Sequence, residues 1–317
     1  MTAVNTESVL ETFAFIATFL MLPPLLVGII RKTKARFQNR IGAPLLQPYF
    51  DLVKMMSKSE TISKHTSWIF RSTAAINVSI LIILAFLAPW TSLRPFNLGA
   101  DLFLVIYLLA LTRFFTVLSA LDAGSAFGGF GASREVTLAL LVEPAVILCL
   151  AAIGSVSQTS DLGIAFAFNN VALSNQPGLW FIASCGLYLA SLVELSRMPA
   201  DDPTTHLELT MVHEAMILEN SAANLALVEY SHFLKILILL GIASQCFLHA
   251  IPFFWHTSRL ILAIASVVNI MILAASIAVI ESVAVKLRWT KLPEFIAYAV
   301  AMSIFCVFIA LSKNLNQ

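Results

Sequence analysis

Charged residues are scarce in this sequence. Of its 317 residues, 12% are Asp, Glu, Lys or Arg and 59% are hydrophobic, and the mean hydropathy is +0.88. A soluble globular domain carries about 25% charged residues, so an ordinary soluble domain is excluded. The net charge of +1 says nothing about nucleic acid, but membrane topology accounts for the basic residues, so we predict no nucleic-acid partner.

Metal-binding and catalytic motifs are missing as well. The four cysteines stand singly in hydrophobic runs, and the sequence has no CxxC pair. Because iron–sulfur and zinc sites need several closely spaced thiolates, we predict that this chain alone holds no such cofactor. No nucleotide-binding loop or nucleophile elbow occurs either, so we predict no catalytic residues in this chain. Any reactive centre belongs to other subunits.

What the sequence does have is long apolar runs. A membrane span needs about 20 mostly apolar residues, and the runs lack the alternation of a membrane barrel. We therefore predict an all-α integral membrane protein in one domain, 1–317. Its eight spans are predicted near 9–30, 69–92, 100–121, 134–155, 178–197, 232–252, 258–284 and 292–311.

The basic residues give these spans an orientation. The segments 31–71 and 285–291 hold 12 of the 19 Lys and Arg residues, and basic loops stay on the cytoplasmic side. We predict an outside N-terminus and cytoplasmic loops at 31–68, 122–133, 198–231 and 285–291. The expected location is the cytoplasmic (inner) membrane of a bacterium or archaeon. Glu7 and Glu11 precede the first run where a signal peptide would be basic, so we predict no cleavable signal peptide.

The three longer loops differ in character. Residues 45–58 alternate apolar and charged side chains, which predicts an amphipathic helix at the membrane interface. The loop 122–133 is rich in glycine, which permits close approach of another surface. The loop 198–231 is acidic and has no Lys or Arg between Arg197 and Lys235. Apolar residues lie between its acidic residues, so we predict a helix over Thr204–Glu219.

Acidic groups held against apolar surface are candidates for proton transfer, because burial moves a carboxyl pKa toward neutrality. A solvated acidic face is the alternative for each residue of the loop. The candidates there are Asp201, Asp202, Glu208, Glu214 and Glu219. His206 and His213 are seven residues apart, unlike the i, i+4 ligand pair of a zinc protease. We predict that they are hydrogen-bonded or proton-relay histidines and that they form no metal site.

Ionisable residues inside spans are functional candidates by default, because they are costly at membrane depth. Glu143 is the strongest, since it lies well inside its span and Pro144 follows it. Glu194 and Arg197 are expected to pair on one helix face. Arg134 and Glu135 begin the fourth span and are also candidates.

Two further charged residues have plainer interpretations. Glu281 is expected to form an interfacial ion pair with Lys286 or Arg288. Arg113 is expected to extend toward the inner surface.

Three ordered segments resemble the membrane subunit shared by respiratory complex I and the energy-converting, membrane-bound [NiFe] hydrogenases, including formate hydrogenlyases. They are KARFQNRIGAPLLQPYFDLVK (34–54), LDAGSAFGGFGASREVTLALLVEP (121–144) and ELSRMPADDPTTHLELTMVHEAMILE (194–219). EFIAYAV (294–300) begins the last span as in that family. The resemblance covers nearly the whole chain, and the acidic segment is its most specific part.

The resemblance implies roles for the matched positions. Glu143 falls on the family's intramembrane glutamate. Glu194, Arg197, Asp201 and Glu208 fall on the polar stretch where the subunit meets a peripheral arm. Residues expected at the docking surface are Arg36, Arg40, Asp122, Gly128 and Gly129.

The resemblance also implies partners and cofactors. The expected partners are peripheral iron–sulfur and hydrogenase-like large and small subunits, antiporter-like membrane subunits and membrane lipids. Iron–sulfur clusters would lie in those partners, with nickel–iron where the large subunit retains its ligands. Complex I has a longer insertion where Arg40 is followed closely by the LLQP at 45–48, and DDPTTHLELTMVHE resembles the hydrogenase branch more closely. Both features argue against a quinone site.

We therefore predict an anchoring subunit that couples electron transfer in a peripheral arm to movement of protons or sodium ions. Three alternatives stay open at this point. A quinone-binding subunit of a complex I-like dehydrogenase would bind quinone. A stand-alone secondary transporter would carry solute by itself, and symmetric broken helices typical of that class are missing from the pattern. A purely structural anchor would keep coupling intact when its acidic residues are neutralised.

Overall fold

The computed structural model describes residues 6–93, 98–168, 176–201 and 211–314. Within these ranges, eight helices are long and apolar enough to cross a membrane, which confirms the predicted all-α membrane fold. They are α1 (Thr6–Phe37), α3 (Trp68–Leu87), α4 (Leu102–Asp122), α5 (Ala126–Ser157), α8 (Pro177–Glu194), α10 (Ala222–His249), α11 (Arg259–Val283) and α12 (Leu292–Asn314).

Short elements join these helices. They are α2 (Gln47–Met56), α6 (Leu162–Ala165), α9 (His213–Ile217) and the 3₁₀ helices η1 (Pro252–His256) and η2 (Trp289–Lys291). The helix α2 confirms the amphipathic helix expected in the first loop: Phe50 and Val53 are exposed, whereas Pro48 is buried. The Tyr49 hydroxyl donates to the Met21 carbonyl of α1, which fastens α2 to the bundle.

Local sequence sets where several helices begin. The side chains of Ser67, Asp101 and Ser125 accept hydrogen bonds from the first free backbone N–H groups of α3, α4 and α5. Such caps satisfy donors that a helix cannot pair internally. Within the apolar segments that follow, only an internally hydrogen-bonded helix leaves no backbone group unpaired in lipid.

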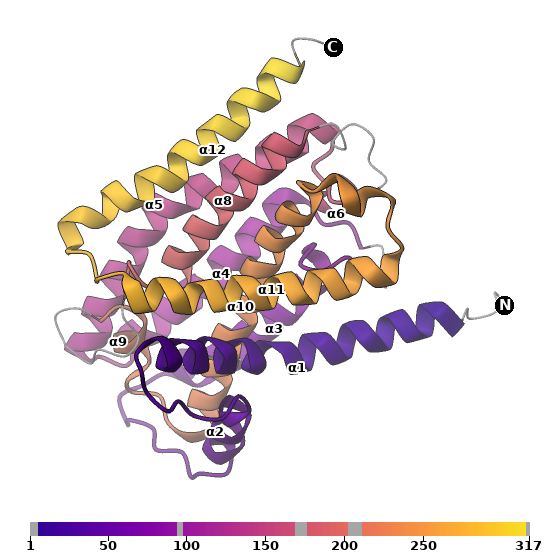
Figure 1. The fold of residues 1–317 in the computed structure, drawn as a ribbon. Coiled ribbons are helices and arrows are strands. Elements are labelled where there is room, and N and C mark those ends of the chain that lie inside the picture. The colour runs from indigo at the N-terminus through magenta and orange to yellow at the C-terminus, as the bar shows by residue number, and fades with distance from the viewer. Residues whose placement is uncertain (1–5, 94–97, 169–175, 202–210, 315–317) are drawn as a thin grey trace.

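The helix α10 lies at the centre of the bundle. It packs against α8, α3, α11 and α1, and it is the most buried of the candidate spans. In Figure 1, α1 runs beside α11, whereas α12 lies beside α5 and α8. Most side chains on α10 are therefore surrounded by other helices of the bundle.

The two ends of the bundle differ. One end carries the C-terminal end of α1 together with α2, α9 and η2, and we call it the basic end because the segments 31–71 and 285–291 lie there. The other end carries α6, η1 and the N-terminal end of α1, and we call it the opposite end.

Two loops are shorter in the structure than predicted, because the helix that follows each of them begins earlier. The helix α5 begins at Ala126, so most of the predicted loop 122–133 is helical. The Ser125 cap starts the helix early, and Gly131 lets α9 pack directly against it, since a Cβ there would lie 2.8 Å from the Val212 carbonyl oxygen. Similarly, α10 begins at Ala222 rather than near residue 232, because the stretch AANLALVEY favours a helix.

Only part of the helix expected over Thr204–Glu219 lies within the described residues. Residues 204–210 lie outside the described residues. The described remainder forms α9 over His213–Ile217, which ends before Glu219.

Candidate functional site

A buried arginine organises the centre of the site. Arg113 lies in the middle of α4, and its side chain is 9% exposed. Its guanidinium forms ion pairs with Glu143 of α5 and Glu194 of α8, and its Nε lies 3.6 Å from Glu135 of α5. A cation inside a membrane bundle is costly unless it is paired, and three carboxylates from two helices supply that pairing.

A second cation completes this cluster. Lys235 of α10 lies 3.1 Å from the Glu194 carboxylate and also donates to the Glu194 carbonyl at 2.9 Å. The central cluster, which we define as Arg113, Glu135, Glu143, Glu194 and Lys235, thus has three carboxylates and two cations. One negative charge is left over, so the cluster has the composition that lets a proton be held or released inside the bundle.

The three carboxylates differ in exposure. The side chains of Glu135 and Glu194 are 11% and 6% exposed, whereas that of Glu143 is 36% exposed. A cavity of about 20 Å³ lies beside Arg113, Glu143 and Glu194. Glu143 is therefore the member of the cluster that reaches the bundle surface.

A second group of ion pairs lies toward the basic end. The Glu281 carboxylate of α11 lies 3.2 Å from Lys34 of α1 and 3.3 Å from Arg197. Asp201 pairs with Lys286 and accepts a hydrogen bond from the Val212 N–H at 3.0 Å. These contacts fasten both described ends of the acidic loop to the bundle.

Two neighbouring cavities lie beside the two groups and share three lining residues. One of about 140 Å³ is lined by Lys34, Arg197, Glu229 and Glu281 among others. The other, of about 40 Å³, is lined by Arg113, Glu135, Glu194 and Lys235 among others. Ser196, His213 and His232 line both cavities. Polar spaces of this kind are where proteins hold bridging water.

His213 and His232 are in contact with each other, and both line the two cavities. Their rings stack with centroids 4.5 Å apart and an interplanar angle of 27°. Burial, and then the nearby cations Lys235 and Arg197, lowers the pKa of His213 from 6.5 to about 4. His213 is therefore a neutral imidazole at pH 7, which both donates and accepts a hydrogen bond.

The structure corrects three expectations about individual charges. Glu194 and Arg197 do not pair with each other, because α8 ends at Glu194 and the chain turns away. Arg113 points into the central cluster rather than toward the surface. Glu281 is buried and pairs with Lys34 and Arg197 instead of Lys286 or Arg288.

The other candidates are distributed around the site. Glu214 lines the larger cavity, whereas Glu219 is exposed. Arg134 lies away from the central cluster, where it donates to the Met211 carbonyl at 3.2 Å. Asp202, His206 and Glu208 lie outside the described residues.

Some of the residues expected at the docking surface are exposed, and others are held in contacts within the bundle. Arg36 and Arg40 are exposed at the basic end. Asp122 accepts hydrogen bonds from the backbone of Ser67 and Phe70, so it holds the start of α3. Gly128 is buried, whereas Gly129 faces open space, since a Cβ added there would meet no atom within 4 Å.

Lys34 and His232 belong to the site although the sequence did not single them out as site residues. Lys34 is one of several basic residues that were used only to orient the spans. Lys235 also belongs to the site, and it was a candidate only as an ionisable residue near a span. The lone arginine at mid-span was the useful signal, because it requires carboxylates nearby.

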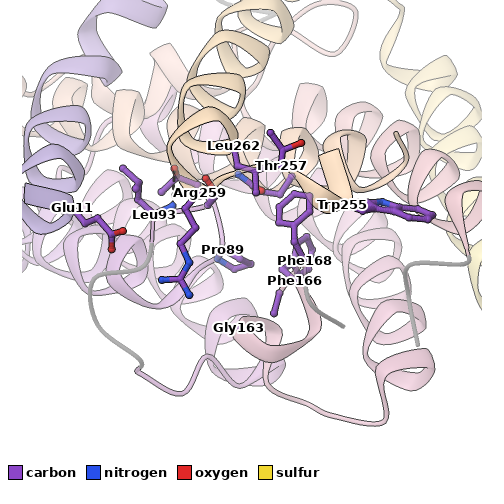
Figure 2. A pocket seen from close by; sticks show the side chains of 14 residues that line it. Glu11, Pro89, Leu93, Gly163, Phe166, Phe168, Trp255, Thr257, Arg259 and Leu262 are labelled. Carbon is purple, nitrogen blue, oxygen red and sulfur yellow. Dashed lines mark hydrogen bonds between the residues drawn. The ribbon is translucent and has the colours of Figure 1, made fainter. Parts of the chain in front are cut away.

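A separate cavity of about 250 Å³ lies at the opposite end. Figure 2 shows Glu11 and Arg259 at one side of it and Phe166, Phe168 and Trp255 at the other. It is lined by none of the candidates predicted from the sequence.

The fold and the buried charges define a class, a helical membrane protein with ion pairs and polar cavities inside the bundle. The chain belongs to the NADH dehydrogenase family, whose model matches residues 10–311. This confirms the family resemblance.

Three individual relatives are similar to this chain over 72% or more of its length. The chain is 36% identical to hydrogenase-4 component C of Escherichia coli (strain K12) over 231 residues, 72% of each chain. It is 29% identical to formate hydrogenlyase subunit 4 of the same organism over 292 residues, which covers 91% of this chain and 94% of the relative. NADH-ubiquinone oxidoreductase chain 1 of Aedes aegypti is 28% identical over 240 residues, 72% of each chain.

A solved structure shares the fold. It is the membrane-bound sulfane sulfur reductase, an archaeal respiratory membrane complex, one chain of which matches with a TM-score of 0.78 and 17% identity. The match covers 96% of this chain and 99% of that one.

Proposed function

We propose that this chain is the membrane-anchor and coupling subunit of a multisubunit energy-converting hydrogenase or a related redox complex. It would link electron transfer in a peripheral arm to translocation of protons or sodium ions. The observation that carries the proposal is the arrangement of ionisable groups around two cavities: Glu281 lines one, the central cluster lines the other, and the histidine pair lines both. Purely structural packing does not require such an arrangement.

The proposed coupling is electrostatic. A change of redox state in an arm docked at the basic end alters the charge near Glu281, Asp201 and the histidine pair. In a poorly screened interior, a nearby charge changes the protonation of carboxylates more strongly than it would in water. The central cluster has one more carboxylate than cations, so its proton occupancy would respond.

Each part of the site has a role in this scheme. Glu229 and Glu281 line the cavity toward the arm. His213 and His232 relay protons between the two cavities. Glu143 would pass the change to a neighbouring antiporter-like subunit, because it reaches the bundle surface. The assigned partners remain those expected from the sequence, with the iron–sulfur clusters, and nickel–iron where present, in the peripheral subunits.

The test uses the complete complex reconstituted into liposomes, with ions moved per electron transferred as the measurement. Glu143→Gln is expected to keep electron transfer and assembly but to lower the ion-to-electron ratio. Glu294→Gln is the matched control, because Glu294 is an exposed carboxylate at the start of α12. If Glu143→Gln keeps the wild-type ratio, the role given to Glu143 is wrong.

The same preparation distinguishes the rival class. A secondary transporter would move solute when this chain is reconstituted alone. The proposal predicts no solute transport by the isolated chain.

A further inference from the structure

A basic pocket of about 290 Å³ lies beside the start of α12, at the basic end. It is lined by Arg134 of α5, by residues 286–289 and by Leu292, with Ala200 and Val212 behind them. None of its lining residues belongs to the central cluster or to the histidine pair. The pocket is therefore distinct from the central cluster and the histidine pair, although Lys286 is also the ion-pair partner of Asp201.

The charge of the pocket is one-sided. Arg134, Lys286 and Arg288 line it, and none of its described lining residues is acidic. Lys286 is paired with the buried Asp201, so among the described residues three lining cations stand beside one carboxylate. A ligand that neutralises this pocket must be anionic.

Arg134 is held in place before any ligand arrives. Its guanidinium carbon lies 3.9 Å from the centroid of the Phe130 ring and 5.5 Å from that of the Trp289 ring. It also donates to the Met211 carbonyl at 3.2 Å. These contacts leave further N–H groups of the fork, whose planar geometry suits two oxygens of one phosphate.

The remaining lining is apolar and comes largely from the segment that leads into α12. Leu287, Trp289 and Leu292 contribute it, and Trp289 is 41% exposed. Tryptophan is enriched where a span meets the headgroup layer. The span Trp289–Lys313 is also among the least buried in the described structure, so the pocket opens where a lipid with a charged head and apolar chains would lie.

We propose that this pocket binds the headgroup of an anionic phospholipid, with Arg134 and Arg288 on the phosphate and the acyl chains along the start of α12. Basic pockets between spans on the cytoplasmic side are typical sites for such lipids. The apolar rim favours a diacyl lipid over free phosphate, because phosphate alone would use only the cations.

The experiment uses the purified, delipidated complex, titrated with phosphatidylglycerol or phosphatidylcholine of the same chain length. Retained lipid is measured by native mass spectrometry and stabilisation by the melting temperature. Phosphatidylglycerol is expected to bind and stabilise more than phosphatidylcholine, whose ammonium group opposes the cations. Arg288→Gln is expected to weaken phosphatidylglycerol binding about tenfold, and Arg134→Gln at least as much.

Arg71→Gln serves as the matched control, because Arg71 is exposed at the same end of the bundle but does not line the pocket. It is expected to bind phosphatidylglycerol as the wild type does. Arg288 is exposed, so its replacement leaves the buried packing intact even if Arg134→Gln fails to fold.

Several results would overturn the proposal. One is equal binding of the two lipids, and another is unchanged phosphatidylglycerol binding in Arg288→Gln. Stabilisation by inorganic phosphate equal to that by phosphatidylglycerol would assign the pocket to a free anion. A photo-crosslinker at position 288 that captures a subunit of the complex rather than lipid would assign it to a protein contact.

Discussion

His213 and His232 stack face to face, with their ring centroids 4.5 Å apart, and both line the two polar cavities. The first comes from the short helix α9 and the second from the central helix α10. The acidic loop and the core of the bundle are thus joined by two imidazoles. A movement of the loop would therefore change the stacking contact between His213 and His232.

Removal of the central cation should destabilise the bundle. In Arg113→Met the carboxylates of Glu135 and Glu143 lose their partner, and breaking a buried ion pair costs about 3–5 kcal/mol. Thermal unfolding of the purified complex is expected to show a clear fall in melting temperature. Arg71→Met, which removes an exposed arginine, should stay close to the wild type. Equal melting temperatures for the two variants would contradict the pairing.

The ion pair between Lys34 and Glu281 should appear as energetic coupling. The pair is buried, with side-chain exposures of 12% and 1%, so each single replacement removes one charge partner of the residue that remains, although Glu281 keeps Arg197. In a double-mutant cycle of Lys34→Met and Glu281→Gln, the double variant is expected to lose less stability than the sum of the single variants. The difference should be about 0.5–3 kcal/mol. Additive losses would mean that the two side chains do not interact.

The docking of α9 should depend on pH. The pKa of His213 is about 4 in the folded protein and 6.5 when exposed, so the unfolded segment binds more protons between these values. Stability should therefore fall as the pH is lowered from about 6.5 toward 4, by up to about 1.4 kcal/mol per pH unit.

Hydrogen exchange of the amides in 211–217, corrected for intrinsic rates, measures this dependence. His213→Gln should flatten it, because glutamine does not titrate. His256→Gln, which replaces an exposed histidine at the opposite end, should leave the profile unchanged. A wild-type profile in His213→Gln would show that another group is responsible.

Two neighbouring glycines should respond differently to the same change. A Cβ at Gly131 would lie 2.8 Å from the Val212 carbonyl oxygen and 3.0 Å from the Ala215 Cβ, whereas nothing lies within 4 Å at Gly129. Gly131→Ala is expected to cost about 1–3 kcal/mol because it overpacks the contact with α9.

Gly129→Ala is the control and should be neutral or slightly stabilising, because alanine favours a helix. Melting temperatures and exchange of the α9 amides measure both effects. Similar results for the two variants would contradict the close packing of α9 on α5.

The pattern of apolar residues was sufficient to predict the candidate membrane-spanning helices. Long apolar runs predicted all eight candidate spans, because hydrogen bonding in lipid leaves no other structure for them. The starts of α5 and α10 were placed too late, since AFGGFGAS and AANLALVEYS carry weaker hydropathy although they are helical. A cap at Ser125 was the local signal for the first of these.

The pairing of charges was harder to predict. Sequence proximity suggested Glu194 with Arg197 and Glu281 with Lys286, yet the partners in the structure come from distant helices. Pairing inside a bundle depends on helix rotation and crossing, which a single sequence does not specify. The choice of Glu143 as an intramembrane candidate rested on its depth in the span, on the following Pro144 and on the family resemblance, and the structure adds its partner Arg113.

The central claim is that carboxylates of the cluster change protonation when the arm changes redox state. The most direct measurement is the reduced-minus-oxidised infrared difference spectrum of the complete complex, compared among the wild type, Glu135→Gln, Glu143→Gln and Glu194→Gln. The account predicts a carboxyl stretching band in the wild type that is lost in at least one of these variants and retained in Glu294→Gln. A band that survives all three replacements, or a wild-type spectrum without one, would contradict it.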